Sequence, residues 1–209
     1  MMQEALTADH YQSIKEKSEA LFKDRGSKFI ALAFPLKDES EFPSILEQVK
    51  KQYYDARHHC YAYRCQPTQP QWRFNDDGEP AHSAGTPIYH AIQSQELWDV
   101  AVIVVRYFGG TKLGVGGLIN AYRSSAEEAL QNARPLDVYL YRQFEVRFPY
   151  SAMDDVMRVL PQSEFEIVGE SMDTDAGYQL KVRKSKTELA LDQLKELYQI
   201  KIKELDEDV

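Results

Sequence analysis

The most constraining feature of this sequence is a continuous apolar run, Val100–Tyr107, that ends abruptly in glycines. The run reads VAVIVVRY and is largely β-branched, a composition typical of a central strand that is buried on both faces. The residues that follow, FGGTKLGVGG, lead into a helical pattern from about Gly117 to Ala133. The segment therefore predicts a buried strand, a tight loop and a long helix in an α/β part of the fold.

Composition indicates a folded protein with a substantial core. The chain has 209 residues, 43% of them hydrophobic and 11% aromatic, which excludes general disorder. Its N-terminus lacks the pattern of a secretion signal, and no stretch approaches the ~20 apolar residues that span a bilayer. Cys60 and Cys65 lie in one predicted strand, which favours buried reduced thiols over a disulfide framework. We therefore predict a cytoplasmic protein without membrane contact.

The net charge of −8 is unevenly distributed along the chain. Residues 1–135 contain 15 basic and 17 acidic side chains, whereas residues 136–209 contain 10 basic and 16 acidic ones. A general basic footprint for nucleic acid is therefore absent, and binding of this kind requires a local patch.

Hydrophobic periodicity predicts an α+β protein of two domains, residues 1–135 and 136–209, because Pro135 ends the long helix and the period then changes. Before the boundary, we predict strands at Phe29–Phe34 and His59–Arg64, a helix from near Ser40, an exposed loop at Trp72–Pro80 and a short helix at Pro87–Gln93. After it, we predict strands at Phe144–Phe148, Glu164–Met172, Tyr178–Arg183 and Ile200–Lys203, with helices at Met153–Leu160 and Thr187–Tyr198. This is the β-α-β-β-α-β order of a split βαβ fold.

The glycine-rich segment is the first candidate site. Glycines permit positive φ and close backbone approach, and the free N–H groups of a helix N-terminus bind anions. The segment lacks the Gly-Lys-Ser/Thr of a P-loop, and Ile119 occupies the third glycine position of a G-x-G-x-x-G motif. A tight turn that binds nothing is the alternative. The predicted anion-binding residues here are Arg106, Gly109, Gly110, Lys112, Gly114, Gly116 and Arg123.

A polar loop at Asn75–Pro80, followed by His82, is the second candidate. Asp77 and Glu79 are suitable ligands for magnesium. Alternatively, the Asp-Gly pair makes a turn and Glu79 pairs with a nearby arginine, and we favour this interpretation because no metal-binding spacing is present. We therefore predict that Asp77, Glu79 and His82 support the site, with no permanent metal and no cofactor.

The third candidate is Asp55–Cys60, at the start of a predicted strand. His59 and Cys60 project to opposite faces of that strand, which prevents a catalytic dyad between them. His58 and Cys60 share a face, and a Cys–His nucleophile requires a distant partner such as His82. We favour a buried Cys60 with histidines lining a groove, and we predict no catalytic residue.

Three stretches, DARHHCYAYR, FNDDGEPAHSAGTPI and VVRYFGGTKLGVGGLINAY, together resemble the IMPACT family. The pattern R-[aromatic]-[aromatic]-G-G-x-x-L-G at Arg106–Gly114 is similar to the signature of that family, and the two-part length is similar to its bacterial YigZ-type members. The resemblance implies an N-terminal domain of the ribosomal-protein-S5 second-domain type. It also implies a ferredoxin-like C-terminal domain similar to the last domain of elongation factor G. Both are related to parts that contact RNA.

We therefore expect a non-catalytic regulator or factor of translation that binds RNA, the ribosome or a protein of the translation machinery. The expected contacts are Arg57, His59, Arg106, Lys112 and Arg123. One alternative is an enzyme or sensor that binds a phosphorylated small molecule at the same loop, with magnesium held by the acidic loop. Another is a protein–protein adaptor, whose contact would use Tyr53, Tyr54 and Trp72.

Overall fold

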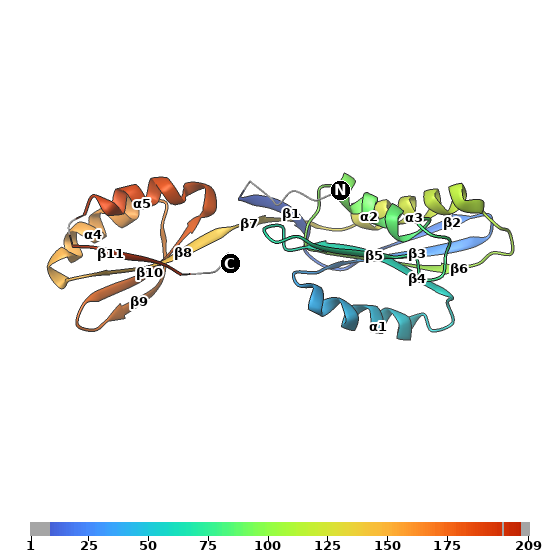
Figure 1. The fold of residues 1–209 in the computed structure, drawn as a ribbon, viewed down its shortest axis with the longest axis horizontal. Coiled ribbons are helices and arrows are strands. Elements are labelled where there is room, and N and C mark those ends of the chain that lie inside the picture. The colour runs from blue at the N-terminus through green and yellow to red at the C-terminus, as the bar shows by residue number, and fades with distance from the viewer. Residues whose placement is uncertain (1–8, 198, 206–209) are drawn as a thin grey trace. The chain divides into compact units, whose positions relative to one another are not determined.

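A computed structural model describes residues 9–197 and 199–205 of the chain (Figure 1). The chain divides into two compact units. The N-terminal unit comprises Tyr11–Val138, and the C-terminal unit begins at Tyr139 and includes residues 9 and 10. The division lies three residues after the boundary that we inferred from Pro135. Each unit has its own hydrophobic core.

The N-terminal unit is built on a five-stranded sheet with the strand order β2-β3-β6-β4-β5. All neighbouring strands are antiparallel. The bounds are β2 (Ser18–Asp24), β3 (Ser27–Pro35), β4 (His58–Cys65), β5 (Gln71–Asn75) and β6 (Val100–Tyr107). The apolar run Val100–Tyr107 is therefore the central strand, as predicted.

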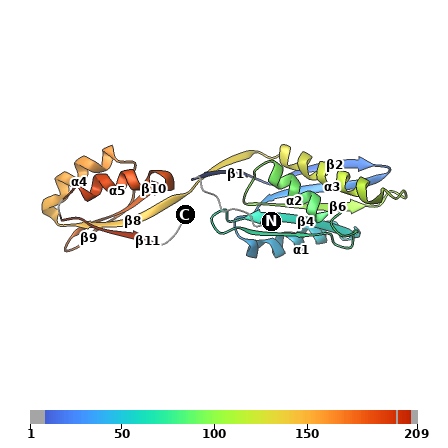
Figure 2. The same cartoon turned by 45° about the horizontal axis from the view of Figure 1, so that its top comes forward.

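Helices cover both faces of this sheet. Helix α1 (Phe42–Gln52) lies on one face, and helices α2 (Gly85–Ser94) and α3 (Gly114–Gln131) lie on the other (Figures 1 and 2). Val100, Val102 and Val104 pack with α2 and α3, whereas Ala101, Ile103 and Val105 pack on the α1 side. Successive residues of a strand face opposite sides of a sheet, which explains why β6 is apolar at every position from Val100 to Val105.

Several strands were not predicted from the sequence. The segment Trp72–Pro80 was predicted as a loop, but its first residues belong to β5, an edge strand whose side chains at Trp72 and Arg73 are exposed. An edge strand lacks a continuous apolar face, and its sequence therefore resembles a loop. The prediction likewise missed β2. It also missed β1 (His10–Ile14) and β7 (Pro135–Tyr139), which form a separate two-stranded sheet.

The C-terminal unit follows the order β-α-β-β-α-β, and its four antiparallel strands are arranged as β11-β8-β10-β9. The bounds are β8 (Tyr141–Phe148), α4 (Met153–Val159), β9 (Glu166–Met172), β10 (Ala176–Arg183), α5 (Thr187–Lys195) and β11 (Lys201–Leu205). The predicted end of the last helix, Tyr198, lies outside the described residues. Short 3-10 helices occupy Glu39–Glu41, Tyr150–Ala152, Leu160–Gln162 and Lys184–Lys186. Together the two units confirm the predicted α+β class.

No helix within the described residues has the length and apolar character that crossing a membrane requires.

Candidate functional site

The candidate site lies at the C-terminal end of β6. Helix α2 precedes β6 and is joined to it by residues 95–99, so that it runs back along the sheet. Helix α3 follows β6 after the glycine-rich segment. Both helices pack against each other on one face. Their N-termini are therefore at the same end of the sheet, where the positive ends of two helix dipoles are near each other.

A buried ion pair supports this end of the sheet. Arg106 Nη1 donates to Glu79 Oε1 at 2.5 Å, and the two side chains are only 8% and 5% exposed. The Tyr122 hydroxyl donates to the same carboxylate oxygen at 2.8 Å, and the rings of Phe29 and Phe108 flank the guanidinium. The charge of Arg106 is thus balanced by Glu79 inside the protein, beneath the glycine-rich segment. The arginine–Glu79 pairing is the arrangement that we favoured from the sequence.

Asp76 closes the N-terminus of α2. Its Oδ1 accepts hydrogen bonds from the backbone amides of Ala84 at 3.0 Å and Gly85 at 2.8 Å, and its Oδ2 accepts from the amide of His82 at 2.8 Å. A Cβ atom at Gly85 would lie 2.7 Å from the backbone nitrogen of Asn75, and the close packing therefore requires glycine here. This capping role was not predicted, because the carboxylate precedes the helix by nine residues.

Asp77 and the adjacent histidines are also connected by internal hydrogen bonds. Asp77 Oδ2 accepts from the backbone amide of His59 at 2.7 Å, and His58 Nδ1 lies 2.8 Å from the backbone oxygen of Asp77. The His59 ring is buried, and its Nε2 lies 3.1 Å from the Tyr53 backbone oxygen. Burial lowers the pKa of His59. His59 pairs with Val105 and faces α1, away from the face that carries α3.

The cysteines are buried, as predicted. Cys60 Sγ donates to the backbone oxygen of Asp76 at 3.0 Å and lies 3.3 Å from the Tyr122 hydroxyl. Burial raises the pKa of the Cys60 thiol, and it raises the pKa of Cys65 to about 12. Because the thiolate is the nucleophilic form, neither side chain is activated for covalent catalysis.

The carboxylates of the acidic loop form hydrogen bonds within the protein. Asp76, Asp77 and Glu79 each accept hydrogen bonds from neighbouring protein groups. Across residues 9–197 and 199–205, no three His, Cys, Asp or Glu side chains gather closely enough to hold a metal ion. Exposed His82 lies beside this loop, with Nδ1 at 3.1 Å from Thr86 Oγ1.

The glycine loop, defined here as residues 108–117, contains glycines of two kinds. Gly109 packs against the β2–β3 turn: a Cβ atom there would lie 1.9 Å from the carbonyl carbon of Gly26, and its amide donates to Ser27 Oγ at 3.1 Å. Gly110 and Gly114 adopt φ values of 87° and 74°, and open space surrounds these two and Gly116. Gly109 thus anchors the loop, whereas Gly110, Gly114 and Gly116 expose its backbone.

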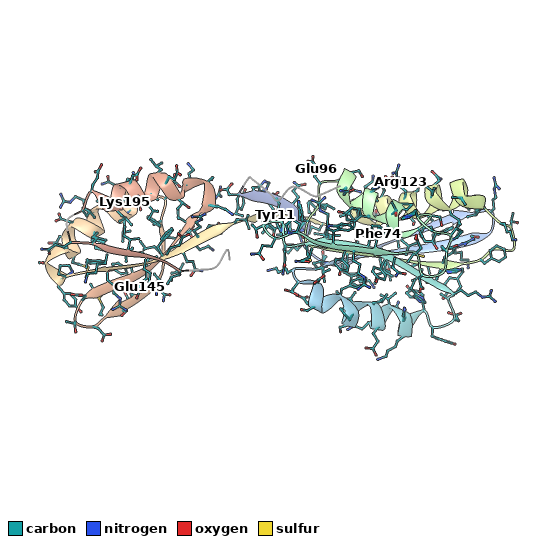
Figure 3. The ribbon with its side chains drawn as sticks, in the orientation of Figure 1. Tyr11, Phe74, Glu96, Arg123, Glu145 and Lys195 are labelled. Atoms are coloured by element: carbon teal, nitrogen blue, oxygen red, sulfur yellow. The ribbon has the colours of Figure 1, made fainter. Side chains whose placement is uncertain are left out.

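The N-terminus of α3 is open, in contrast to that of α2. Within the described residues, no side chain accepts a hydrogen bond from its first-turn amides. Lys112 precedes this turn and is exposed. Gly116, Asn120 and Arg123 form an exposed stripe with helical spacing, and Arg123 projects from the outer side of α3 (Figure 3). Arg123 is therefore about 13 Å along the helix from Gly114.

The structure leaves only part of the predicted cationic set at the surface. Lys112, Arg123 and Arg57 are exposed and form no ion pair with any described residue. Arg57 immediately precedes β4, whose start pairs with the end of β6. Arg106 and His59 are instead buried. Tyr122 lies on the buried face of α3, and no local signal in the sequence indicated its bond to Glu79.

Residues 25–130 match the family model described as the Impact N-terminal domain. The chain belongs to the IMPACT family. It is 34% identical over 155 residues to the IMPACT family member YvyE of Bacillus subtilis (strain 168), covering 74% of this chain and 71% of that protein. It is 29% identical over 144 residues to the family member YigZ of Escherichia coli (strain K12), covering 68% and 71% of the two chains.

A solved structure has the same fold as this IMPACT family chain. The crystal structure of a hypothetical protein aligns with a TM-score of 0.68 at 22% sequence identity, and the alignment covers 96% of this chain and 99% of the other. Family membership confirms the resemblance found in the three sequence stretches.

Proposed function

We propose that this chain is a non-catalytic factor of translation that binds RNA or the ribosome through the glycine loop and the adjacent outer face of α3. The observation that carries this proposal is the open N-terminus of α3, with Lys112 and Arg123 exposed and unpaired among the described residues. The neighbouring helix, α2, has its amides occupied by Asp76. The contrast leaves one of the two positive helix ends available to a ligand.

Phosphate groups match the chemistry of this surface. Backbone amides at a helix N-terminus donate to phosphate oxygens, and the helix dipole favours negative charge. Gly110, Gly114 and Gly116 lack side chains that would obstruct the approach of a phosphate. Lys112 and Arg123 add positive charge at two points separated by more than two helical turns. An extended polyanion contacts both points, whereas a single phosphate contacts one.

The hydrogen bonds of the buried side chains support a binding role. Cys60 and Tyr122 are hydrogen-bonded in the interior, and Glu79 is bound by Arg106 and Tyr122. These are the groups that an enzyme would need as nucleophile, acid or base. Their positions fit a rigid support beneath the loop, in which Arg106 positions the loop and Lys112 contacts the ligand.

The link to translation rests on a finer assignment of the two units. We infer that the N-terminal unit is of the ribosomal-protein-S5 second-domain type. The β-α-β-β-α-β order and the strand arrangement β11-β8-β10-β9 support a ferredoxin-like C-terminal unit similar to the last domain of elongation factor G. Fold analogy supplies the biological context, and the site supplies the ligand chemistry.

An adaptor that binds a protein of the translation machinery is the second candidate. Phe108 and Val115, in the glycine loop, are 56% and 53% exposed, and Ile119 follows on α3 at 36%. Exposed apolar side chains grouped in this way favour a protein contact. Tyr54 is 84% exposed and Trp72 is 45% exposed, as an adaptor surface at those positions requires.

A salt titration of RNA and ribosome binding tests the proposal. Replacing Lys112 or Arg123 with glutamine should weaken binding to every RNA sequence and reduce the slope of log affinity against log salt by about 0.7 to 0.9. Lys51→Gln is the matched control, because Lys51 lies on α1 and is exposed. Thermal melts of each variant verify folding.

The alternatives make different predictions in the same experiment. Unchanged RNA and ribosome affinity in both folded variants would contradict the proposal. Binding of a phosphorylated metabolite without RNA binding would favour the small-molecule sensor. Loss of binding to a translation protein in Phe108→Ser, with Lys112→Gln unaffected, would favour the adaptor.

A further inference from the structure

The sheet of the C-terminal unit has one face without a helix layer. Helices α4 and α5 cover only one side of it (Figures 1 and 2). Phe144, Val146, Phe148 and Leu180 face this helix layer and form the core. Because alternate residues face opposite sides of a strand, the intervening positions of β8 and β10 belong to the open face, where they are exposed or half-buried except at Gly177.

Basic side chains are concentrated on the open face. The strand registers place Lys201 opposite Arg147 and Lys203 opposite Glu145, and they place Arg183 opposite Tyr141 and Lys181 opposite Gln143. The open face thus carries five basic residues and two acidic ones. The basic residues are Arg147, Lys181, Arg183, Lys201 and Lys203, and the acidic residues are Glu145 and Glu166.

Most of this positive charge is not neutralised by neighbouring carboxylates. Lys181, Lys201 and Lys203 form no ion pair with any residue that the structure describes, whereas Arg147 Nη2 pairs with Glu145 at 2.8 Å. Arg183 stacks on the Tyr139 ring at 3.9 Å and also acts electrostatically on Asp9. The face therefore retains a positive balance.

The positive face contrasts with the composition of its unit. Residues 136–209 contain 10 basic and 16 acidic side chains, and half of the basic ones lie on this face. The helix side has basic residues that are paired instead: Lys186 with Glu164, Lys195 with Asp192, and Arg158 with Asp155. Net charge alone indicated no such footprint, because the acidic residues lie largely elsewhere.

The arrangement of the cations favours an extended ligand. They lie at two opposite corners of the face. Lys201 is the strand partner of Arg147 near one end of β8, and Arg183 is the strand partner of Tyr141 near the other end. At about 3.3 Å per residue, the six residue steps from Tyr141 to Arg147 span about 20 Å. A polyanion contacts both corners, whereas a compact anion contacts only one.

The groups between the two corners favour nucleic acid over an acidic peptide. Lys181 Nζ lies 3.8 Å from the centroid of the Tyr141 ring, which places an aromatic surface beside a cation. The amide side chains of Gln143 and Gln179 share the open face. Aromatic rings stack on bases, amides donate to and accept from base edges, and cations contact the phosphates of a single strand.

We propose that the open face of the β11-β8-β10-β9 sheet is a second binding surface, specific for single-stranded nucleic acid. It uses residues of the C-terminal unit only, and it does not depend on the glycine loop. Lys181 and Arg183 bind the strand at one corner, Lys201 and Lys203 bind it at the other, and Tyr141 with the two glutamines contacts bases between them.

Fluorescence anisotropy with a labelled 12-nucleotide oligouridine tests this surface in the full chain. The two test variants are Lys181→Gln with Arg183→Gln, and Lys201→Gln with Lys203→Gln. The matched control, Lys186→Gln with Lys195→Gln, removes the same charge from the helix side, where Figure 3 shows Lys195. Each test variant should lose at least about tenfold in affinity at low salt, and its salt slope should fall by about 1.4. The control should change affinity by less than about twofold.

Further variants distinguish binding at the open face from binding elsewhere on the protein. The charge-preserving variant Lys181→Arg with Arg183→Lys should retain most of the affinity if positive charge is what matters. Loss in Lys112→Gln with Arg123→Gln but not in the open-face variants overturns this proposal and leaves the glycine loop. Loss in the open-face variants alone supports it and contradicts the loop.

Two other results overturn the proposal. One is an equal loss in the control and the test variants, which indicates a general charge effect. The other is tight binding of a polyglutamate peptide that the oligonucleotide cannot displace, which identifies an acidic protein as the ligand. Thermal melts of all variants confirm that a lost affinity is not lost folding.

Discussion

Breaking the buried ion pair between Arg106 and Glu79 should destabilise the N-terminal unit strongly. The side chains are 8% and 5% exposed and the contact is 2.5 Å. In Arg106→Met, the Glu79 carboxylate stays buried, and among residues 9–197 and 199–205 the Tyr122 hydroxyl is then its one hydrogen-bond donor. Removing one member of a buried pair typically costs about 3–5 kcal/mol, because the remaining charge is uncompensated. We expect the free energy of unfolding to fall by about that amount in Arg106→Met and in Glu79→Leu.

The double variant separates this mechanism from simple loss of packing. Replacing both members with apolar side chains leaves no unpaired charge, and such replacements are often neutral or stabilising. We therefore expect Arg106→Met with Glu79→Leu to be more stable than either single variant. The exposed pair Lys51–Glu47, with side chains 74% and 66% exposed, supplies a control. Lys51→Met should cost at most about 0.5 kcal/mol.

Urea denaturation followed by tryptophan fluorescence measures the free energy of unfolding of the N-terminal unit, which contains the ion pair. Both tryptophans, Trp72 and Trp98, lie in the N-terminal unit, and their emission therefore reports the unfolding of that unit. Single-variant losses below about 1 kcal/mol would refute the reasoning. So would a double variant whose loss equals the sum of the two single losses, since additivity means that the two side chains are not coupled.

Three further predictions follow from the same structure. Gly109→Ala should be severely destabilising, because its Cβ would overlap the backbone at Gly26, whereas Gly116→Ala meets open space and should cost little; thermal melts compare them. Burial lowers the pKa of His59, so the unfolded state binds its proton first as pH falls through about 6.5. Stability should therefore decrease between about pH 7 and pH 5, and His59→Gln should show a smaller decrease in urea titrations. Finally, fragments divided between Val138 and Tyr139 should each unfold cooperatively, and a fragment without a cooperative melt would contradict two independent cores.

Local patterns in the sequence determined the elements with strong periodicity. The predicted strand Val100–Tyr107 has the same bounds as β6, because burial on both faces leaves an uninterrupted apolar run. The expected positions of the helices α2, α3, α4 and α5 were close to those observed, because a helix that buries one face repeats its apolar residues every three to four positions. The edge strand β5 escaped prediction, since its exposed residues carry no such pattern.

Motif content likewise determined the family, whose three stretches all lie within the matched residues 25–130. A glycine-rich segment, a polar loop and a histidine-containing strand were recognisable from the sequence alone. The role of each residue inside these segments was not recognisable from the sequence. Arg106 and Lys112 are both cations in one motif, yet Arg106 is buried and Lys112 is exposed.

Only the tertiary structure decided these roles, because the deciding partners are distant in sequence. Glu79 is 27 residues from Arg106 and 43 from Tyr122, and the turn that requires glycine at position 109 is formed by residues more than 80 positions earlier. Residue type and periodicity report how much of a segment is buried, but they do not report which buried groups meet. Side chains meet only after strands pair and helices pack, and a charge becomes internal or available to a ligand at that stage.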